Sequence, residues 1–218
     1  MQKEFFLKVQ NFFLNNSYVV IKNHLNQTES KIFYEYCKNK VKAIDFKSIN
    51  VSEKYDKDWD GKFGDFQTPR AYNCYGDTLM DTILSVSTNA VSNYTNIELE
   101  PTYSYWRFYQ KNNDLKKHID RKSCEISGTL CLGYDTSNLD DKNYCWPIYV
   151  EDKNTKKPIE IKLYPGDLLI YRGCDLQHWR ENYLGLNHAQ VFLHYNDKND
   201  INRIPLDGRP MLGIPKKY

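Results

Sequence analysis

Hydrophobic residues in the first hundred positions recur mostly at helical spacing. Phe5, Phe6, Val9, Phe12 and Phe13 fall at i, i+1, i+4, i+7 and i+8, which predicts a helix with one face on a core. The pattern also predicts an edge strand over 18–21 and a helix over 26–41. A third helix is predicted to begin after the N-cap Asp77 and to end near residue 93. Its residues available for packing are Leu79, Ile83, Leu84, Val86 and Val91.

The pattern changes at Pro101, where short runs rich in strand formers replace the helical spacing. These runs are separated by Gly, Pro, Asn and Asp, as expected for strands joined by turns. They cover residues 102–109, 126–133, 146–150, 158–163, 167–171, 176–180 and 188–195. Helices followed by many short strands predict an α+β fold with a β-sandwich or jelly roll.

Residues 50–73 show no hydrophobic period and contain Gly61, Gly64 and Pro69. They are predicted to form a long polar loop with aromatic residues in it, and loops of this length are usually functional or disordered. No repeat or linker divides the chain, so we expect one domain over 1–218. Its parts would be a helical layer and loop (1–100), a β-core (101–196) and a C-terminal tail (197–218).

Composition narrows the class of protein. Hydrophobic residues make up 40% of the chain and charged residues 27%, which favours a packed core over disorder. The net charge of +2 argues against binding nucleic acid through bulk charge. No run approaches about 18 apolar residues, and no cleavable signal is recognisable, so we expect a cytoplasmic protein without a membrane span. The six cysteines include no C-x-x-C pair and are predicted to be reduced and mostly buried.

Candidate chemistry centres on three residues of the β-rich half. His118 and Asp120 form a His-x-Asp motif, whose side chains would share one side of a strand, and His178 follows on another predicted strand. A lone His-x-Asp is more often a surface turn. Here a tight turn at 165–167, an apolar strand and a Gly-containing turn precede His178, and this context favours a metal site. Two imidazoles and one carboxylate form the facial triad of non-haem Fe(II) oxygenases.

With these motifs the sequence resembles the 2-oxoglutarate/Fe(II)-dependent dioxygenases, in their prolyl-4-hydroxylase-like branch. The matching segments are 102–132, 165–181 and 188–195, so the resemblance covers about residues 101–196. It implies a double-stranded β-helix (jelly roll) with an N-terminal helical layer packed on one sheet. It also implies that His118, Asp120 and His178 bind Fe(II). Because related halogenases lack the carboxylate, Asp120 favours hydroxylation.

The resemblance further implies that 2-oxoglutarate chelates the iron and that its distal carboxylate needs a buried cation and hydroxyl donors. Tyr109 matches a family position that supplies a hydroxyl, and Thr129 lies where a residue that lines the pocket is expected. The family's Arg or Lys, nine or ten residues after the distal histidine, is replaced here by Asn187 and His188.

Three residues are candidates to replace that missing cation. Arg180 shares the facing of His178 and carries a fork-shaped guanidinium, so it is favoured. Arg107 shares the facing of Tyr109, and His188 could act if protonated. The residues that share the facing of His188 on the last strand, which are Gln190, Phe192 and His194, are expected to be core or pocket wall.

The implied reaction is hydroxylation of a C–H bond, with Fe(II) as cofactor and 2-oxoglutarate converted to succinate. Dioxygen would be a partner, and ascorbate is a candidate co-reductant. The branch points to a prolyl residue in a peptide or protein, and small-molecule substrates stay open. Loop 50–73 is predicted to contact the substrate. Two alternatives remain: a non-catalytic jelly-roll binding or structural protein with a vestigial metal site, and an iron enzyme that uses another reductant.

Overall fold

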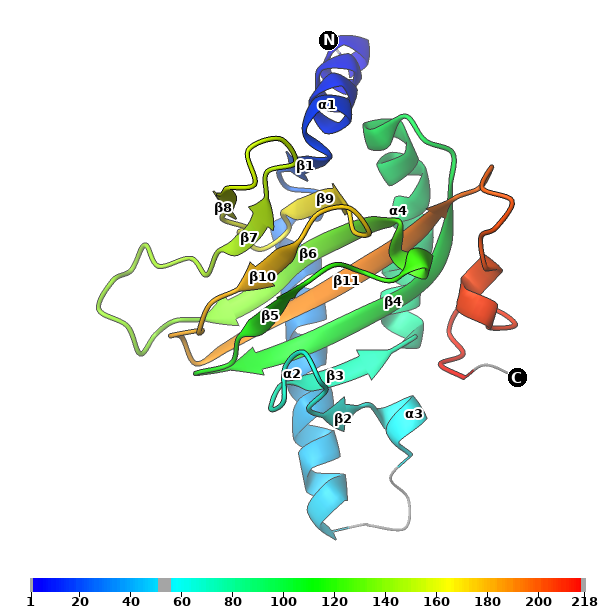
Figure 1. Cartoon of the computed structure of the whole chain (residues 1–218). Helices are drawn as coiled ribbons and strands as arrows, with labels where there is room; N and C mark the ends of the chain where they lie inside the picture. Colours follow the sequence, from blue (N-terminus) through cyan, green and yellow to red (C-terminus); the bar gives the residue numbers. More distant parts are fainter. Residues whose placement is uncertain (1, 51–55, 217–218) are drawn as a thin grey trace.

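Two antiparallel sheets form the centre of the molecule, and the structure, a computed structural model, describes residues 2–50 and 56–216. The larger sheet has the order β1-β9-β6-β11-β4-β3-β2, and the smaller has the order β5-β10-β7-β8 (Figure 1). The strands are β1 (Tyr18–Ile21), β2 (Lys62–Phe63), β3 (Tyr72–Tyr75), β4 (Leu99–Gln110), β5 (Leu115–His118), β6 (Ile126–Asp135), β7 (Ile148–Glu151), β8 (Pro158–Ile161), β9 (Leu168–Arg172), β10 (His178–Arg180) and β11 (Asn187–Asp197). This arrangement confirms the predicted jelly roll.

The helices are α1 (Gln2–Asn16), α2 (Gln27–Asn50), α3 (Lys57–Asp60) and α4 (Thr78–Thr95), and α2 and α4 cover one face of the larger sheet. Figure 1 shows α2 and α4 crossing the far side of this sheet. Outward-facing residues of the strands, such as Trp106 and Val191, share a buried cluster with Leu84 of α4 and Val41 of α2. The expected helical layer on one sheet is therefore confirmed.

The other face of the larger sheet looks toward the smaller sheet and carries the polar residues of the interior. In the register of β11 and β4, His188 lies opposite Tyr109 and His194 lies opposite Tyr103. Alternation along these strands sends Trp106 and Val191 to the helices and sends their neighbours inward. The strand pattern thus places the polar side chains between the sheets.

Three details of the helical half differ from expectation. Only Phe13 of the predicted α1 stripe is fully buried, whereas Phe5 and Phe12 are 51% and 44% exposed, because much of α1 projects beyond the sheet (Figure 1). Val86 was expected to be available for packing but is 72% exposed on α4. Helix α2 runs past residue 41 because Ile44, one further turn along, continues its buried face.

The segment predicted to be a loop over 50–73 is partly built into the sheet. The stretch 51–55 lies outside the described residues, and α3, β2 and the start of β3 occupy much of the remainder. Phe63 pairs with Tyr72, and Tyr72 in turn pairs with Phe108 of β4. The polar, glycine-containing sequence of this segment shows no hydrophobic alternation, so these short strands are revealed only by the strands they pair with. No helix in the described parts of the chain has the length and apolar character needed to span a membrane.

Candidate metal centre

The structure brings His118, Asp120 and His178 together at one end of the smaller sheet. His118 ends β5 and lies opposite His178, the first residue of β10. Asp120 follows β5, and its main-chain N–H donates to the carbonyl of Gly173 at 2.8 Å. One ligand atom from each of the three side chains lies within 4.8 Å of the others. The pairing of β5 with β10 therefore joins two motifs that lie about sixty residues apart.

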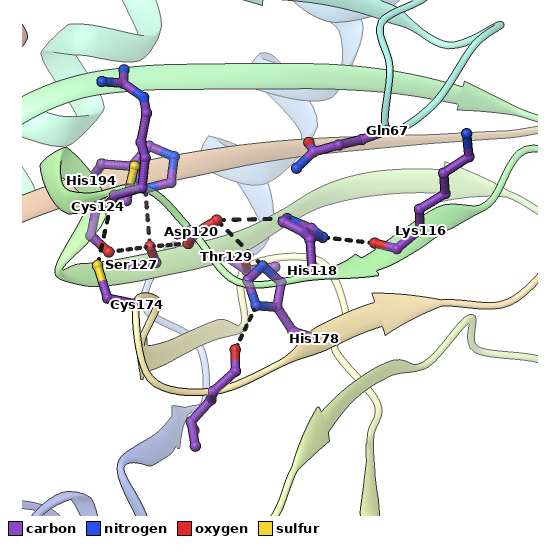
Figure 2. Close-up of polar contacts among 12 residues, drawn as sticks. Gln67, Lys116, His118, Asp120, Cys124, Ser127, Thr129, Cys174, His178 and His194 are labelled. Atoms are coloured by element: carbon purple, nitrogen blue, oxygen red, sulfur yellow. Dashed lines mark hydrogen bonds and ion pairs between the residues drawn. The ribbon is translucent and has the colours of Figure 1, made fainter.

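Hydrogen bonds fix the orientation of both imidazoles. Nδ1 of His118 lies 2.7 Å from the carbonyl of Lys116, and Nδ1 of His178 lies 3.0 Å from the carbonyl of Leu176 (Figure 2). A carbonyl only accepts, so each Nδ1 carries a hydrogen, and in a neutral ring this leaves the Nε2 lone pair for a metal. Both Nε2 atoms face Oδ1 of Asp120, at 3.6 and 3.5 Å.

The charges of this group favour a cation. Two imidazole lone pairs that face a carboxylate oxygen repel it, and a cation bound by all three atoms would remove that repulsion. Two nitrogens and one oxygen match the donor set that Fe(II) takes in a facial triad. The residues present therefore fit such a metal.

A cavity of about 680 Å³ opens beside the three residues. Its walls include Tyr103, Tyr105, Tyr171, Phe192 and His194, which come from β4, β9 and β11. Residues of the predicted 50–73 loop complete its outer part, namely Lys57, Asp58, Gly61, Lys62, Asp65, Phe66, Gln67 and Asn73. The cavity is large enough for a drug-sized ligand.

Arg107 lines this cavity, but its charge already has a partner. Its Nη2 donates to Oδ2 of Asp65 and to Oε1 of Gln67, both at 2.6 Å. The Tyr105 hydroxyl donates to the same carboxylate oxygen at 2.8 Å. Arg107 thus fastens the 64–68 turn to β4. It is poorly suited to anchor a second carboxylate, because Asp65 neutralises it.

Arg180 lies deeper between the sheets and does not line the cavity. It donates to the carbonyl of Trp146 at 2.7 Å and to Oε1 of Gln190 at 2.6 Å, and its guanidinium lies 4.5 Å from the centre of the Trp146 ring. The other buried arginines, Arg107 and Arg209, each form an ion pair with an aspartate. Among the described residues, Arg180 has no carboxylate partner, and burial lowers its pKa.

Of the remaining predicted co-substrate residues, His188 and Tyr109 lie close to Arg180. His188 is fully buried, and burial and the charge of Arg180 hold its pKa well below the usual value, so it is neutral and cannot supply the cation. Its Nε2 lies 3.0 Å from Oε1 of Gln190. Tyr109 lies against the same Trp146 ring, with ring centres 4.9 Å apart. Thr129, on the inner face of β6, lies 3.4 Å from the Tyr171 hydroxyl.

Buried polar atoms without hydrogen-bond partners gather around Arg180. Within the described residues there are eight such side-chain atoms, and four of them belong to this group. They are the Tyr109 hydroxyl, Nε of Arg180, Nδ1 of His188 and Nε2 of Gln190. The Tyr109 hydroxyl also lies beside Arg107, without a hydrogen bond of good geometry. Since buried polar groups are normally satisfied, this cluster indicates a polar ligand site.

Sequence reasoning missed the roles of Gln190, Ser127 and Asp65. Gln190 joins Arg180 to His188, Ser127 donates to Oδ2 of Asp120 at 2.7 Å, and Asp65 holds Arg107. Alternation along the strands placed Gln190 on the inner face but could not show what it contacts. Asp65 lies in a segment without periodicity, so no pattern marked it.

No protein-family model matches the sequence, and no curated protein matches it significantly. Solved structures do match the fold. A prolyl-4-hydroxylase from Pseudomonas putida shares 10% identity at a TM-score of 0.65, over 89% of this chain and 100% of that one. A prolyl hydroxylase from Trichoplax adhaerens, solved with a hypoxia-inducible-factor peptide fragment, shares 14% identity at a TM-score of 0.63, over 90% and 92%.

HygX from Streptomyces hygroscopicus, solved with nickel and 2-oxoglutarate bound, is also similar. It shares 12% identity at a TM-score of 0.59, over 88% of this chain and 87% of that one. These likenesses confirm the resemblance noted from the motifs at the level of fold. The chain has the double-stranded β-helix of the 2-oxoglutarate/Fe(II) oxygenases, and its fold is like that of the prolyl-4-hydroxylases among them.

Proposed function

We propose that the protein is an Fe(II)- and 2-oxoglutarate-dependent oxygenase that hydroxylates a C–H bond. The observation that carries this proposal is the convergence of His118, Asp120 and His178 beside a cavity in a double-stranded β-helix. These residues would bind the metal on one face and leave three positions for other ligands. HygX, which shares the fold, was solved with a metal and 2-oxoglutarate bound.

Arg180 is the residue that we assign to the distal carboxylate of 2-oxoglutarate. A buried cation without a counter-charge is costly, and an incoming carboxylate would relieve that cost. The Gln190 amide nitrogen, on the side chain that bonds this guanidinium, and the Tyr109 hydroxyl, which lies near both Arg107 and Arg180, have no hydrogen-bond partner and offer further donors. In this assignment the cation comes from β10, two residues after the distal histidine, while neutral His188 occupies the position usual for the basic residue.

When bound, the metal would supply the oxidising chemistry with dioxygen as the oxidant: one oxygen atom would enter succinate as 2-oxoglutarate loses carbon dioxide, and the other would convert a substrate C–H bond to an alcohol. The chain's own residues would bind the metal, orient its ligand atoms and form the walls of the cavity. The histidine–carbonyl bonds would keep both Nε2 atoms directed toward the metal, and Tyr103, Tyr171 and Phe192 line the cavity with aromatic surface.

For the substrate we propose a peptide or protein, with a prolyl residue as the first to test. The outer cavity is open and includes Phe66, which is 81% exposed, and Ile119, which is 53% exposed. The Trichoplax relative in fold was solved with a peptide fragment, although HygX was also solved with hygromycin B. Limited proteolysis checks whether substrate protects the 56–73 segment, and unchanged cleavage there would argue against its contact with substrate.

The first experiment needs no substrate. Fe(II) and 2-oxoglutarate are added anaerobically, and the weak visible charge-transfer band of the chelate is titrated. We expect a saturable band in the wild type and in Asp175→Ala, which removes an exposed carboxylate near the site, and no band in Asp120→Ala. Bound iron without a band would favour an iron enzyme with another reductant, and no bound iron would favour a non-catalytic jelly roll.

Turnover assays extend this test. Formation of succinate with candidate peptides separates an oxygenase from a binding protein. The described residues assign no role to ascorbate, so the assay is run with and without it. We also propose a cytoplasmic location, which the six unpaired cysteines support because reduced thiols are typical of that compartment.

A further inference from the structure

The two carboxylate oxygens of Asp120 have different surroundings. Oδ1 faces Nε2 of both His118 and His178, whereas Oδ2 accepts a hydrogen bond from the Ser127 hydroxyl at 2.7 Å (Figure 2). Ser127 lies on the inner face of β6 and contacts His194 of β11, with its oxygen 3.0 Å from Nδ1 of the imidazole. A chain of contacts therefore leads from Asp120 through Ser127 to His194.

The hydroxyl of Ser127 has one hydrogen and two oxygen acceptors within reach. Oδ2 of Asp120 is at 2.7 Å and carries charge, while the carbonyl of Cys124 is at 3.2 Å. The shorter, charged acceptor takes the hydrogen. Nδ1 of His194 must then be the donor to the Ser127 oxygen. Burial lowers the pKa of His194 to about 4, so its neutral ring carries a single hydrogen, which this contact places on Nδ1.

Packing on the other side of the carboxylate is equally tight. A Cβ atom at Gly173 would clash with Oδ2 of Asp120, with the Cys124 carbonyl and with Oγ of Ser127. The carbonyl of Gly173 also accepts the main-chain N–H of Asp120 at 2.8 Å. Oδ2 is thus enclosed between the β9–β10 turn and β6, and only Oδ1 is turned toward the histidines.

We propose that Ser127 and His194 are positioning residues that hold Asp120 as a one-oxygen ligand of the metal. This inference rests on the proposed function, in which the three residues bind a divalent metal. A carboxylate free to turn could bring both oxygens to the metal and occupy a position that the co-substrate or dioxygen needs. Hydrogen bonds to ligating carboxylates also tune metal affinity, and their removal typically lowers it about 10- to 100-fold.

Titration with Co(II), followed by its visible d–d absorption, tests this role without a substrate. We expect Ser127→Ala to weaken Co(II) binding about 10- to 100-fold and to change the band shape. Ser127→Thr, which keeps the hydroxyl, should stay within a few-fold of wild type. Ser87→Ala is the matched control, because Ser87 is a buried serine bonded to a histidine, His24, outside the cavity.

A second set of variants tests His194, which lies at the other end of the row of contacts from Asp120. His194→Phe keeps an aromatic ring against Tyr103 and Phe192 but removes the donor, so it should weaken Co(II) binding in the same direction as Ser127→Ala. His194→Gln offers an amide donor and should recover part of the loss. Equal affinity and identical spectra for wild type, Ser127→Ala and His194→Phe would overturn the inference.

A second measurement uses only the wild-type protein and so does not depend on how well the variants fold. Long-range ¹H–¹⁵N correlation spectra of ¹⁵N-histidine-labelled protein report the tautomer of each ring, and His194 should be neutral with its hydrogen on Nδ1. A hydrogen on Nε2 would overturn the inference. If wild-type protein bound no Co(II) at all, the proposed function itself would fail, which is a different outcome from unchanged binding in the variants.

Discussion

Replacement of Arg180 by methionine is the sharpest test of the proposed 2-oxoglutarate site. Arg180 is 2% exposed, and its guanidinium bonds only to neutral oxygens and has no carboxylate partner among the described residues. Loss of one member of a buried charge pair typically costs about 2–5 kcal/mol of binding free energy. A loss of about 3 kcal/mol corresponds to a dissociation constant for 2-oxoglutarate raised more than about 100-fold.

The same change should have little effect on the ligand-free protein. Arg180→Met removes a buried charge that lacks a counter-charge, and this gain offsets the hydrogen bonds lost to Trp146 and Gln190. We expect the free energy of unfolding to change by less than about 2 kcal/mol. Arg209→Met should instead destabilise by about 3–5 kcal/mol, because Asp81 would be left as a buried, unpaired charge.

The assay compares 2-oxoglutarate with pyruvate on the Fe(II)-loaded protein, in the absence of oxygen. Pyruvate has the chelating keto acid but no distal carboxylate. Wild-type protein should prefer 2-oxoglutarate, and Arg180→Met should lose that preference while its affinity for pyruvate stays the same. Thermal unfolding gives an independent readout, since ligand at about 100 times its dissociation constant stabilises the fold by about 2.7 kcal/mol.

Two results would refute the assignment. Equal weakening of both keto acids would mean that Arg180 acts only on the structure of the pocket. If Arg107→Met removed the preference for 2-oxoglutarate and Arg180→Met did not, the anchor would be the cavity-lining arginine, released from Asp65 when the ligand binds.

Three further changes test the surrounding framework by urea unfolding. Burial opposes ionisation of Asp207, but hydrogen bonds, above all from half-exposed Arg121, hold its pKa well below the usual range. Asp207→Asn should therefore lower the free energy of unfolding by about 1–2 kcal/mol at pH 7. This loss of stability should shrink below about pH 4, and a loss that stayed constant there would contradict the reasoning. Gly166→Ala should cost about 2–4 kcal/mol, because φ is +93° and a Cβ would strike a backbone carbonyl, whereas Gly128→Ala should cost clearly less. Asp77→Ala removes the N-cap of α4 and an ion pair to α2, and should cost about 2–3 kcal/mol, with Asp77→Asn losing less because it keeps a cap.

Alternation and motif spacing made the β-rich half predictable. Each strand predicted after Pro101 is present, with its ends displaced by a few residues, and the His-x-Asp motif and His178 meet as expected. The motifs meet because β5 pairs with β10, which brings residues at facing positions of the two strands together once the sheet forms.

Contacts that depend on several elements at once could not be predicted. Arg180 was the favoured cation, but the sequence could not show which arginine already has a carboxylate partner. The structure shows that Asp65 pairs with Arg107, which leaves Arg180 as the arginine without one among the described buried arginines. Burial of His188, which keeps it neutral, depends on Trp146 and Arg180 packing around it. Likewise, Val86 has the residue type of a core position, and only the placement of α4 against the sheet exposes it.

The larger sheet takes its outer strands from the early part of the chain. Strand β1 pairs with β9 at one side, while β3 and β2 extend β4 at the other. A fragment limited to residues 99–197 would therefore expose β9 and β4 as unpaired edges, together with the apolar face that α2 and α4 now cover. Exposed edges of this kind recruit other chains. Trimming the protein to its β-rich half should yield an aggregating fragment, because the first hundred residues close the sheet as well as cover it.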